Sequence, residues 1–200
     1  MRTALRYIVA IVIGLALGVI AAVHTVRAGA FGSTTSIGPW RTGRDFGTAD
    51  ANARTRAVVA LSGLLALPAR EARYYTAATD DAGQPLDGRC RYHIAGGELP
   101  GRWWSLTLYD GDGYLAGAGP YSVESAAVAR VQAARPRPVD YVALPDQWQV
   151  SVGPSATGEL ALPTAGLYHF ELTLRAYLPP DGGRGNPPRS SLPSITKEGC

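Results

Sequence analysis

The longest run of apolar positions lies near the N-terminus, from Tyr7 to Val26, and contains no Asp, Glu, Lys or Arg. A helix of that length, at about 1.5 Å per residue, spans a hydrocarbon core of about 30 Å. A helix is required there because lipid cannot satisfy free backbone groups. Arg2 and Arg6 precede the run, which favours a cytoplasmic N-terminus. We therefore predict a single transmembrane anchor over residues 1–27, in a bacterial inner membrane, with the remaining chain in the periplasm.

A cleaved signal peptide is the competing interpretation of this segment. Ala28-Gly29-Ala30 fits the small-x-small pattern of a cleavage site. The apolar run is longer than the usual core of a signal peptide, about 7–15 residues, which favours a retained anchor. Whether the segment is cleaved after Ala30 stays open, and both interpretations export the domain.

Beyond the anchor the pattern indicates a linker and then one helix. Residues 28–47 are rich in Gly, Ser and Thr and have no clear period, so we predict a linker there and a domain over residues 48–200. Thr48 to Leu67 is predicted to be a packed amphipathic helix, with Thr48 or Asp50 as its N-cap and Pro68 as its end. Its expected apolar face, at helical spacing, consists of Ala57, Val58, Leu61, Leu64 and Leu65.

From Arg70 onward the pattern changes to short strands separated by turn residues. Ser122 to Val131 is compatible with either a strand or a helix, and the Pro- and Gly-rich tail from Pro179 is expected to lie over the surface. This pattern predicts a mainly β fold, an antiparallel, jelly-roll-like β-sandwich with the helix packed against it. The expected strands are Ala72–Thr79, Cys90–Ala95, Trp103–Tyr109, Trp148–Val152 and Leu167–Tyr177.

Charge and motifs exclude several classes of function. The net charge is +3, but Arg2 and Arg6 supply two of these charges and no basic cluster follows, so no nucleic-acid partner is predicted. The chain has three histidines, His24, His93 and His169, and lacks the H-E-x-x-H, G-x-S-x-G and P-loop motifs. We therefore predict no catalytic residues, no cofactor and no metal site, although a triad without a motif stays open.

An acidic turn and two cysteines are candidates for special sites. Asp110-Gly111-Asp112-Gly113 begins like a calcium loop, but its twelfth position is Tyr121 rather than Glu, so a hairpin turn is predicted. Cys90 and Cys200 are the only cysteines. An even count in an exported chain predicts a disulfide between them, with free thiols or an intermolecular bridge as the alternatives.

Aromatic residues and one arginine are the candidates for ligand binding. Adjacent residues of a strand point to opposite faces, so Trp103 or Trp104 should lie in the core and the other outside. Arg175 with Tyr177 on one strand face is suited to an anion or a carboxylate, and a solvated cross-strand pair is the competing interpretation. The candidate ligand-binding residues are Trp103, Trp104, Tyr109, Tyr114, Arg175 and Tyr177.

Two runs, Trp103 to Leu115 and Gly158 to Pro179, resemble the bacterial domain-of-unknown-function family 1214. In that family an aromatic-rich strand ends in Tyr before an Asp-Gly turn, and a later strand closes on Arg-x-Tyr-x-Pro, here Arg175 to Pro179. Short alphaproteobacterial members are also similar in the anchor, the Gly-Pro-Trp segment and the terminal Cys. The resemblance runs from about Glu71 to the C-terminus.

The resemblance implies a β-sandwich in a membrane-linked context and carries no reaction with it. Family members commonly have an Asn-Trp-Leu-Pro run before the last strand, whereas the corresponding residues here are Glu159 to Pro163, without Asn or Trp. A ligand contact made by that run in relatives would therefore be missing from this chain.

Three hypotheses of function follow from these features. The first is a non-enzymatic, membrane-tethered periplasmic domain that binds an envelope protein or a small ligand. The second is an envelope hydrolase acting on a lipid or glycan, which needs carboxylates or histidines to converge in a pocket. The third is a structural subunit of a membrane complex, with Gly14 and Gly18 forming a G-x-x-x-G helix contact.

Overall fold

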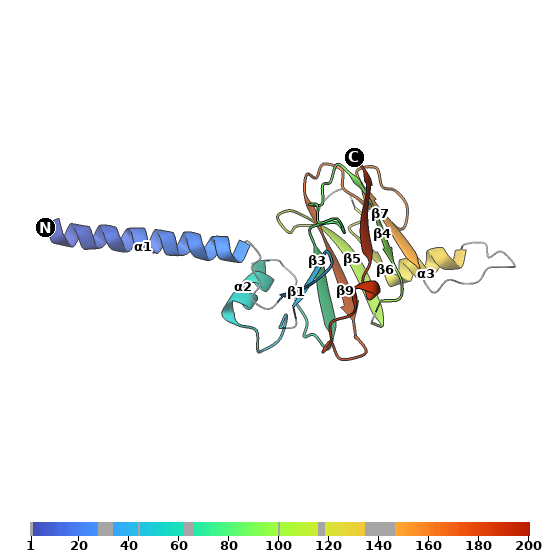
Figure 1. Cartoon of the computed structure of the whole chain (residues 1–200), viewed down its shortest axis with the longest axis horizontal. Helices are drawn as coiled ribbons and strands as arrows, with labels where there is room; N and C mark the ends of the chain where they lie inside the picture. The colour runs from blue at the N-terminus through green and yellow to red at the C-terminus, as the bar shows by residue number, and fades with distance from the viewer. Residues whose placement is uncertain are drawn as a thin grey trace.

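The N-terminal helix α1 (Arg2–Arg27) extends away from the rest of the chain (Figure 1). The structure is a computed structural model, and it describes residues 2–27, 34–43, 45–61, 66–99, 101–115, 119–134 and 147–200. The apolar part of α1, Thr3–His24, is long enough to cross a membrane, and none of it is buried against the domain. These features are compatible with a single-pass membrane anchor.

Two β-sheets form the domain, which confirms the predicted mainly β class. The six-stranded sheet is antiparallel throughout and contains, in spatial order, β1 (Thr34–Ile37), β2 (Trp40–Gly43), β3 (Ala72–Ala77), β9 (Phe170–Tyr177), β5 (Trp103–Asp110) and β6 (Ser122–Glu124). The four-stranded sheet is mixed, because its last pair is parallel; it contains β10 (Ser194–Gly199), β4 (Arg91–Gly96), β7 (Trp148–Gly153) and β8 (Ala161–Pro163). The jelly-roll-like detail stays a prediction.

The main hydrophobic core lies between the two sheets. Along β9, alternate residues point into it, because successive side chains of a strand face opposite sides; they are Phe170, Leu172, Leu174 and Ala176. Trp104 on β5 stacks on Trp148 on β7, with ring centroids 4.4 Å apart, and so joins the two sheets. The alternation visible in the sequence of this last long strand therefore identifies its core face.

The soluble helix is shorter and starts later than predicted. α2 (Ala53–Leu61) is capped by Asn52, whose Oδ1 accepts a hydrogen bond from the Thr55 backbone N–H at 2.8 Å. Thr48, one of the predicted caps, instead donates its hydroxyl to the Asp45 carbonyl, because residues 45–51 form turns. Val59 packs on the sheet. Of the predicted apolar face, Leu64 and Leu65 and the side chains of Val58 and Leu61 lie outside the described part of the structure, so that face stays a prediction.

The ambiguous segment from Ser122 contains both kinds of element, β6 followed by α3 (Ser125–Ala134). Two strand pairings were not predicted: β1 with β2, and β10 with β4. β1 and β2 form a hairpin within the residues assigned to a linker, and Trp40 is fully buried, with its Nε1 donating to the Pro193 carbonyl at 2.7 Å. The tail contains a single 3₁₀ turn, Arg189–Ser191, and then β10 as an edge strand.

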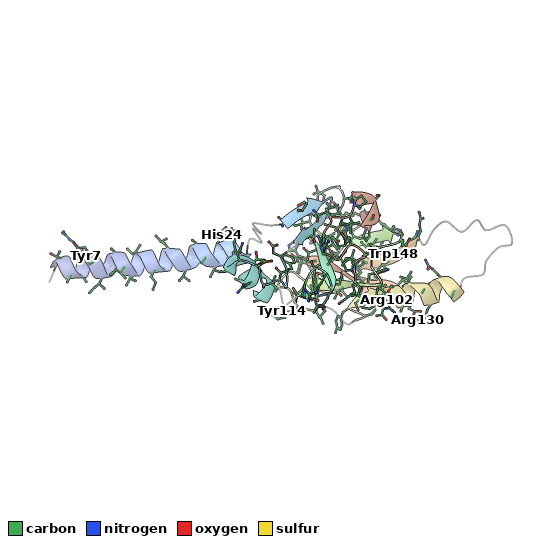
Figure 2. All side chains as sticks on the ribbon, turned by 90° about the horizontal axis from the view of Figure 1, so that it is seen from below. Tyr7, His24, Arg102, Tyr114, Arg130 and Trp148 are labelled. Carbon is green, nitrogen blue, oxygen red and sulfur yellow. A yellow bond between two sulfur atoms is a disulfide. The ribbon has the colours of Figure 1, made fainter. Side chains whose placement is uncertain are left out.

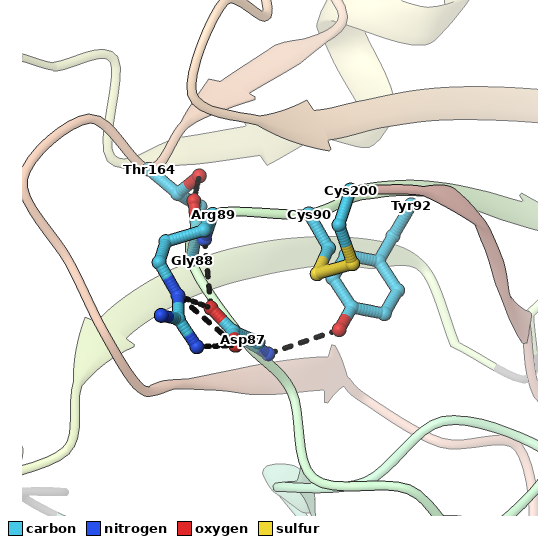
Figure 3. The surroundings of a disulfide bond; sticks show 7 residues. All are labelled: Asp87, Gly88, Arg89, Cys90, Tyr92, Thr164 and Cys200. Carbon is cyan, nitrogen blue, oxygen red and sulfur yellow. Dashed lines mark hydrogen bonds and ion pairs between the residues drawn. A yellow bond between two sulfur atoms is a disulfide. The ribbon is translucent and has the colours of Figure 1, made fainter.

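A disulfide joins Cys90 to Cys200 and closes a separation of 110 residues (Figure 3). Cys90 directly precedes β4 and Cys200 directly follows β10, so the bond lies at one end of this antiparallel pair. Close to it, the Tyr92 hydroxyl accepts a hydrogen bond from the Asp87 backbone N–H at 2.9 Å. The C-terminal strand is thus held to the sheet by pairing and by a covalent bond.

Candidate functional site

The side of the six-stranded sheet that faces away from the core carries most of the polar and aromatic candidates. We call it the outer face. The registers of β3, β9 and β5 place Tyr74, Arg175 and Ser105 side by side across these three strands. By the same alternation, the outer face is made of Ala72, Tyr74 and Thr76 on β3, Glu171, Thr173, Arg175 and Tyr177 on β9, and Trp103, Ser105, Thr107 and Tyr109 on β5.

Arg175 is the half-buried centre of the outer face. Its Nη1 donates to the Thr107 hydroxyl at 3.0 Å, and its Nη2 donates to the Tyr109 hydroxyl at 2.6 Å. The guanidinium carbon lies 5.6 Å from the centre of the Tyr109 ring and 6.0 Å from that of Tyr74, within the range of cation–π attraction. Two neutral hydroxyls and two rings therefore fix the orientation of a planar, permanently charged group.

No carboxylate oxygen of a described residue lies within ion-pair distance of Arg175. Among the arginines that the structure describes, those that form ion pairs are Arg70, Arg89, Arg130 and Arg189. A guanidinium has five N–H donors, of which Thr107 and Tyr109 each take one. Within the described part of the chain, the fork of Arg175 thus has donors to spare for an anionic group.

An aromatic pair and a row of hydroxyls flank this arginine. Trp103 and Tyr177 lie opposite each other, with ring centroids 4.9 Å apart. Thr107 and Thr173 pair across β5 and β9 on the other side of Arg175 and are only 7% and 3% exposed. The surroundings of Arg175 are therefore aromatic at one end and rich in hydroxyl groups at the other.

A carboxylate occupies the far end of the same strand face. Glu171 lies opposite Tyr109. The Glu171 side chain is exposed to solvent, but the protein atoms around its carboxyl group partly desolvate it. This desolvation raises the pKa of Glu171, and the charge of Arg41 acts against that rise. Thr173 lies between Glu171 and Arg175 along β9, so the two charges stay apart.

The helix α2 covers part of the outer face. Val59 of α2 and Ala66 pack against a small cluster of Phe46, Ala72 and Tyr74, and Tyr177 joins them. α1 ends beside α2 (Figure 1). The end of the outer face that carries Ala72, Tyr74 and Tyr177 therefore lies close to the end of the apolar helix.

The described fold and site allow comparison with known proteins. A family model described as "Protein of unknown function (DUF1214)" matches residues 71–181. The chain belongs to the DUF1214 family. The resemblance predicted from the aromatic strand and the Arg175–Pro179 run is thereby confirmed, and every outer-face residue named above lies within the matched range.

One solved structure similar to the DUF1214 domain is that of the VPA0106 protein from Vibrio parahaemolyticus. The two chains are 21% identical with a TM-score of 0.50, and the likeness covers 74% of this chain and 36% of the other. The chain thus spans about a third of that protein's length, and at this identity the likeness concerns the fold alone. No curated protein matches the chain.

Four of the six candidate residues come together on the outer face of the DUF1214 domain: Trp103, Tyr109, Arg175 and Tyr177. Trp104 does not, since it is buried in the core against Trp148. Tyr114 lies largely exposed in the turn that follows β5 (Figure 2). There Asp110 accepts hydrogen bonds from the backbone N–H groups of Asp112 and Tyr114, as a hairpin turn requires.

Sequence analysis missed two members of the site, Tyr74 and Thr107. Alternation along β5 places Thr107 on the same face as Tyr109, and this signal was available in the sequence. Nothing in the sequence shows that β3 is the neighbour of β9, which is what brings Tyr74 to Arg175. Long-range strand order was the missing information.

The two histidines of the domain, His93 and His169, lie away from the outer-face cluster, and His24 lies in α1. His93 is on β4, with Nδ1 3.8 Å from a carboxylate oxygen of Glu198, and His169 is exposed and pairs with Asp87 through the backbone. Among the residues that the structure describes, no group of three potential metal ligands is found. The outer face is therefore the candidate site that the described geometry supports best.

Proposed function

We propose that this protein is a membrane-tethered binding domain on the periplasmic side of the cell envelope, which binds a small organic anion on its outer face. The observation that carries the proposal is the state of Arg175: a fixed guanidinium that only neutral hydroxyls and rings contact among the described residues. A carboxylate or phosphate can take up its remaining donors in a bidentate pair.

The surroundings of Arg175 favour binding over a purely structural role. A structural arginine usually fills its donors with carbonyls or carboxylates, because an uncompensated buried charge is costly. Arg175 is instead half-buried, so that a ligand can approach it, and the Trp103–Tyr177 pair offers an apolar surface beside it. The long apolar helix α1 supports the tether.

The proposal is tested by isothermal titration calorimetry, in which hexanoate is titrated into the full-length protein in detergent micelles and the affinity is measured. Arg175→Gln should weaken binding about tenfold or more, because a charge-assisted bidentate pair is lost. Arg102→Gln is the matched control: it removes one positive charge from an exposed residue next to Trp103 (Figure 2) and should change the affinity less than about twofold. Equal binding by the wild type and Arg175→Gln would contradict the proposal.

A further inference from the structure

We infer that the anion bound at Arg175 belongs to an amphiphile that reaches the outer face from the membrane: a carboxylate or phosphate group that carries a hydrocarbon chain. This inference rests on the proposed function and specifies the ligand class of the same site. Three observations carry it: the position of the site relative to α1, the apolar surface that leads away from Arg175, and the length of the connection to the anchor.

The apolar surface begins at the arginine itself. Tyr74, whose ring lies beneath the guanidinium, is buried in the cluster under α2 and supports this surface from below. Tyr177, the next outer-face residue of β9, is half-buried and packs against the same cluster. Leu67 and Leu178 adjoin these two tyrosines and are 39% and 53% exposed. The Leu67 backbone N–H donates to the Tyr74 hydroxyl at 2.9 Å, which fixes this part of the surface.

This surface leads toward the anchor. α2 packs on the cluster and α1 ends beside α2 (Figure 1), so the half-buried Tyr177, which packs against the same cluster, leads from Arg175 toward the end of the apolar helix. A head group at Arg175 with its chain along the half-buried Trp103 and Tyr177 and the exposed Leu178 would match charge with charge and hydrocarbon with apolar surface.

The connection to the anchor keeps this face close to the bilayer. Six residues, 28–33, separate the end of α1 at Arg27 from Thr34 in the first strand. Even fully extended, the chain from Arg27 to Thr34 spans at most about 25 Å. The edge strand β1 of the sheet that carries the outer face therefore stays close to the end of the anchor, within reach of amphiphiles that lie in the membrane surface or leave it.

Tryptophan fluorescence gives a local signal for such a ligand. Three of the four tryptophans, Trp40, Trp104 and Trp148, are buried in the core, whereas Trp103 is the half-buried one on the outer face. A quencher on a hydrocarbon chain at this face should therefore act mainly on Trp103. Loss of the quenching in Trp103→Phe would assign the signal to this residue.

The experiment uses the full-length protein in nanodiscs. One arm compares discs that contain phosphatidylglycerol with brominated chains and discs that contain equally brominated phosphatidylcholine; a second arm titrates unbrominated phosphatidylcholine discs with brominated dodecanoate. We expect saturable quenching of Trp103 by dodecanoate, by phosphatidylglycerol, or by both, and the arms distinguish a free amphiphile from a lipid head group. Arg175→Gln should weaken the effect about tenfold or more, and Arg102→Gln less than about twofold.

The short-chain titration separates failure of this inference from failure of the proposed function. If hexanoate binds in an Arg175-dependent manner but neither brominated amphiphile quenches Trp103, the ligand is a soluble anion and the inference is wrong, while the proposed function stands. If neither short nor long anions bind in an Arg175-dependent manner, both are wrong. Quenching that is equal in wild type and Arg175→Gln also overturns the inference, because the chain would then approach Trp103 without its head group on Arg175.

Discussion

Two arginines on neighbouring strands of the six-stranded sheet have opposite surroundings. Arg73, on β3, is 2% exposed and donates to the carbonyls of Gly183 and Gly185 and to the side chains of Thr42 and Asn186. It thereby fixes the loop that follows β9. Arg175 donates only to Thr107 and Tyr109 among the described residues. The comparison assigns Arg73 to structure and leaves Arg175 available to a ligand.

The buried tyrosine beneath Arg73 gives the domain a dependence on alkaline pH. Burial raises the pKa of Tyr75, and the Arg73 guanidinium, 5.7 Å from the ring centre, acts against that rise. Burial likewise raises the pKa values of Tyr74 and Tyr92. A group that is harder to deprotonate in the folded state contributes stability that is complete below its unfolded pKa, about 10, and is lost as the pH rises through the folded value.

Urea unfolding at a series of pH values above 9 checks this dependence. The free energy of unfolding of the wild type should fall as the pH rises above about 10. In Tyr75→Phe the slope should be shallower by up to about one proton, or about 1.4 kcal/mol per pH unit, because the substituted ring does not titrate. An unchanged slope in Tyr75→Phe would show that Tyr75 ionises equally easily in both states.

At the scale of elements, the edge strand β10 is held by three kinds of contact. It pairs with β4, and its end is bonded through Cys200 to Cys90. On its open side, the Ile195 backbone N–H donates to the Asp81 carboxylate and the Ile195 carbonyl accepts from the Asp81 backbone N–H. An unpaired strand edge invites association with other chains, and Asp81 occupies this one.

Removal of the disulfide should therefore destabilise the domain without altering its sheets. Chain entropy predicts a loss of about 4–5 kcal/mol for a closed loop of this size. The double variant Cys90→Ala, Cys200→Ala avoids a free thiol and should unfold at a lower urea concentration than the oxidised wild type. Wild type treated with a reductant is the control and should behave like the variant. A variant as stable as the oxidised wild type would mean that pairing and Asp81 alone hold β10.

The sequence predicted long strands better than short ones. β5 and β9 each carry several alternations, so their positions and core faces were recognisable. β1, β2 and β8 have only three or four residues each, and β10 is polar, so none carries a pattern of its own. They form strands because a neighbouring strand, the disulfide or the burial of Trp40 holds them in place.

The same limit applies to the candidate site and to α2. Alternation placed Trp103 and Trp104 on opposite faces, but which face each one takes depends on the sheet that packs beneath β5. Thr48, Asp50 and Asn52 can each cap a helix. Because residues 45–51 form turns, α2 begins only after them and Asn52 is its cap. Local propensity indicated that a helix and a strand exist, whereas tertiary contacts set their bounds and neighbours.

At the scale of the whole molecule, one apolar helix is joined to a two-sheet domain, and α2 connects the end of that helix to one end of the outer face (Figure 1). The arrangement accounts for the combination of an apolar N-terminal segment, a disulfide and a half-buried arginine in one short chain. In our proposal the anchor holds the domain at the membrane, the sandwich supports the outer face, and Arg175 binds the ligand.

Native mass spectrometry of the full-length protein, purified in mild detergent from the membranes in which it is made, tests this account most directly. The account predicts an intact chain that carries a small anionic adduct, which is retained in Arg102→Gln and lost in Arg175→Gln; the mass of the released adduct then identifies the ligand. A chain that begins after Ala30 would contradict the tether. An adduct of equal abundance in Arg175→Gln, or none in the wild type, would contradict Arg175 as the centre of the binding site.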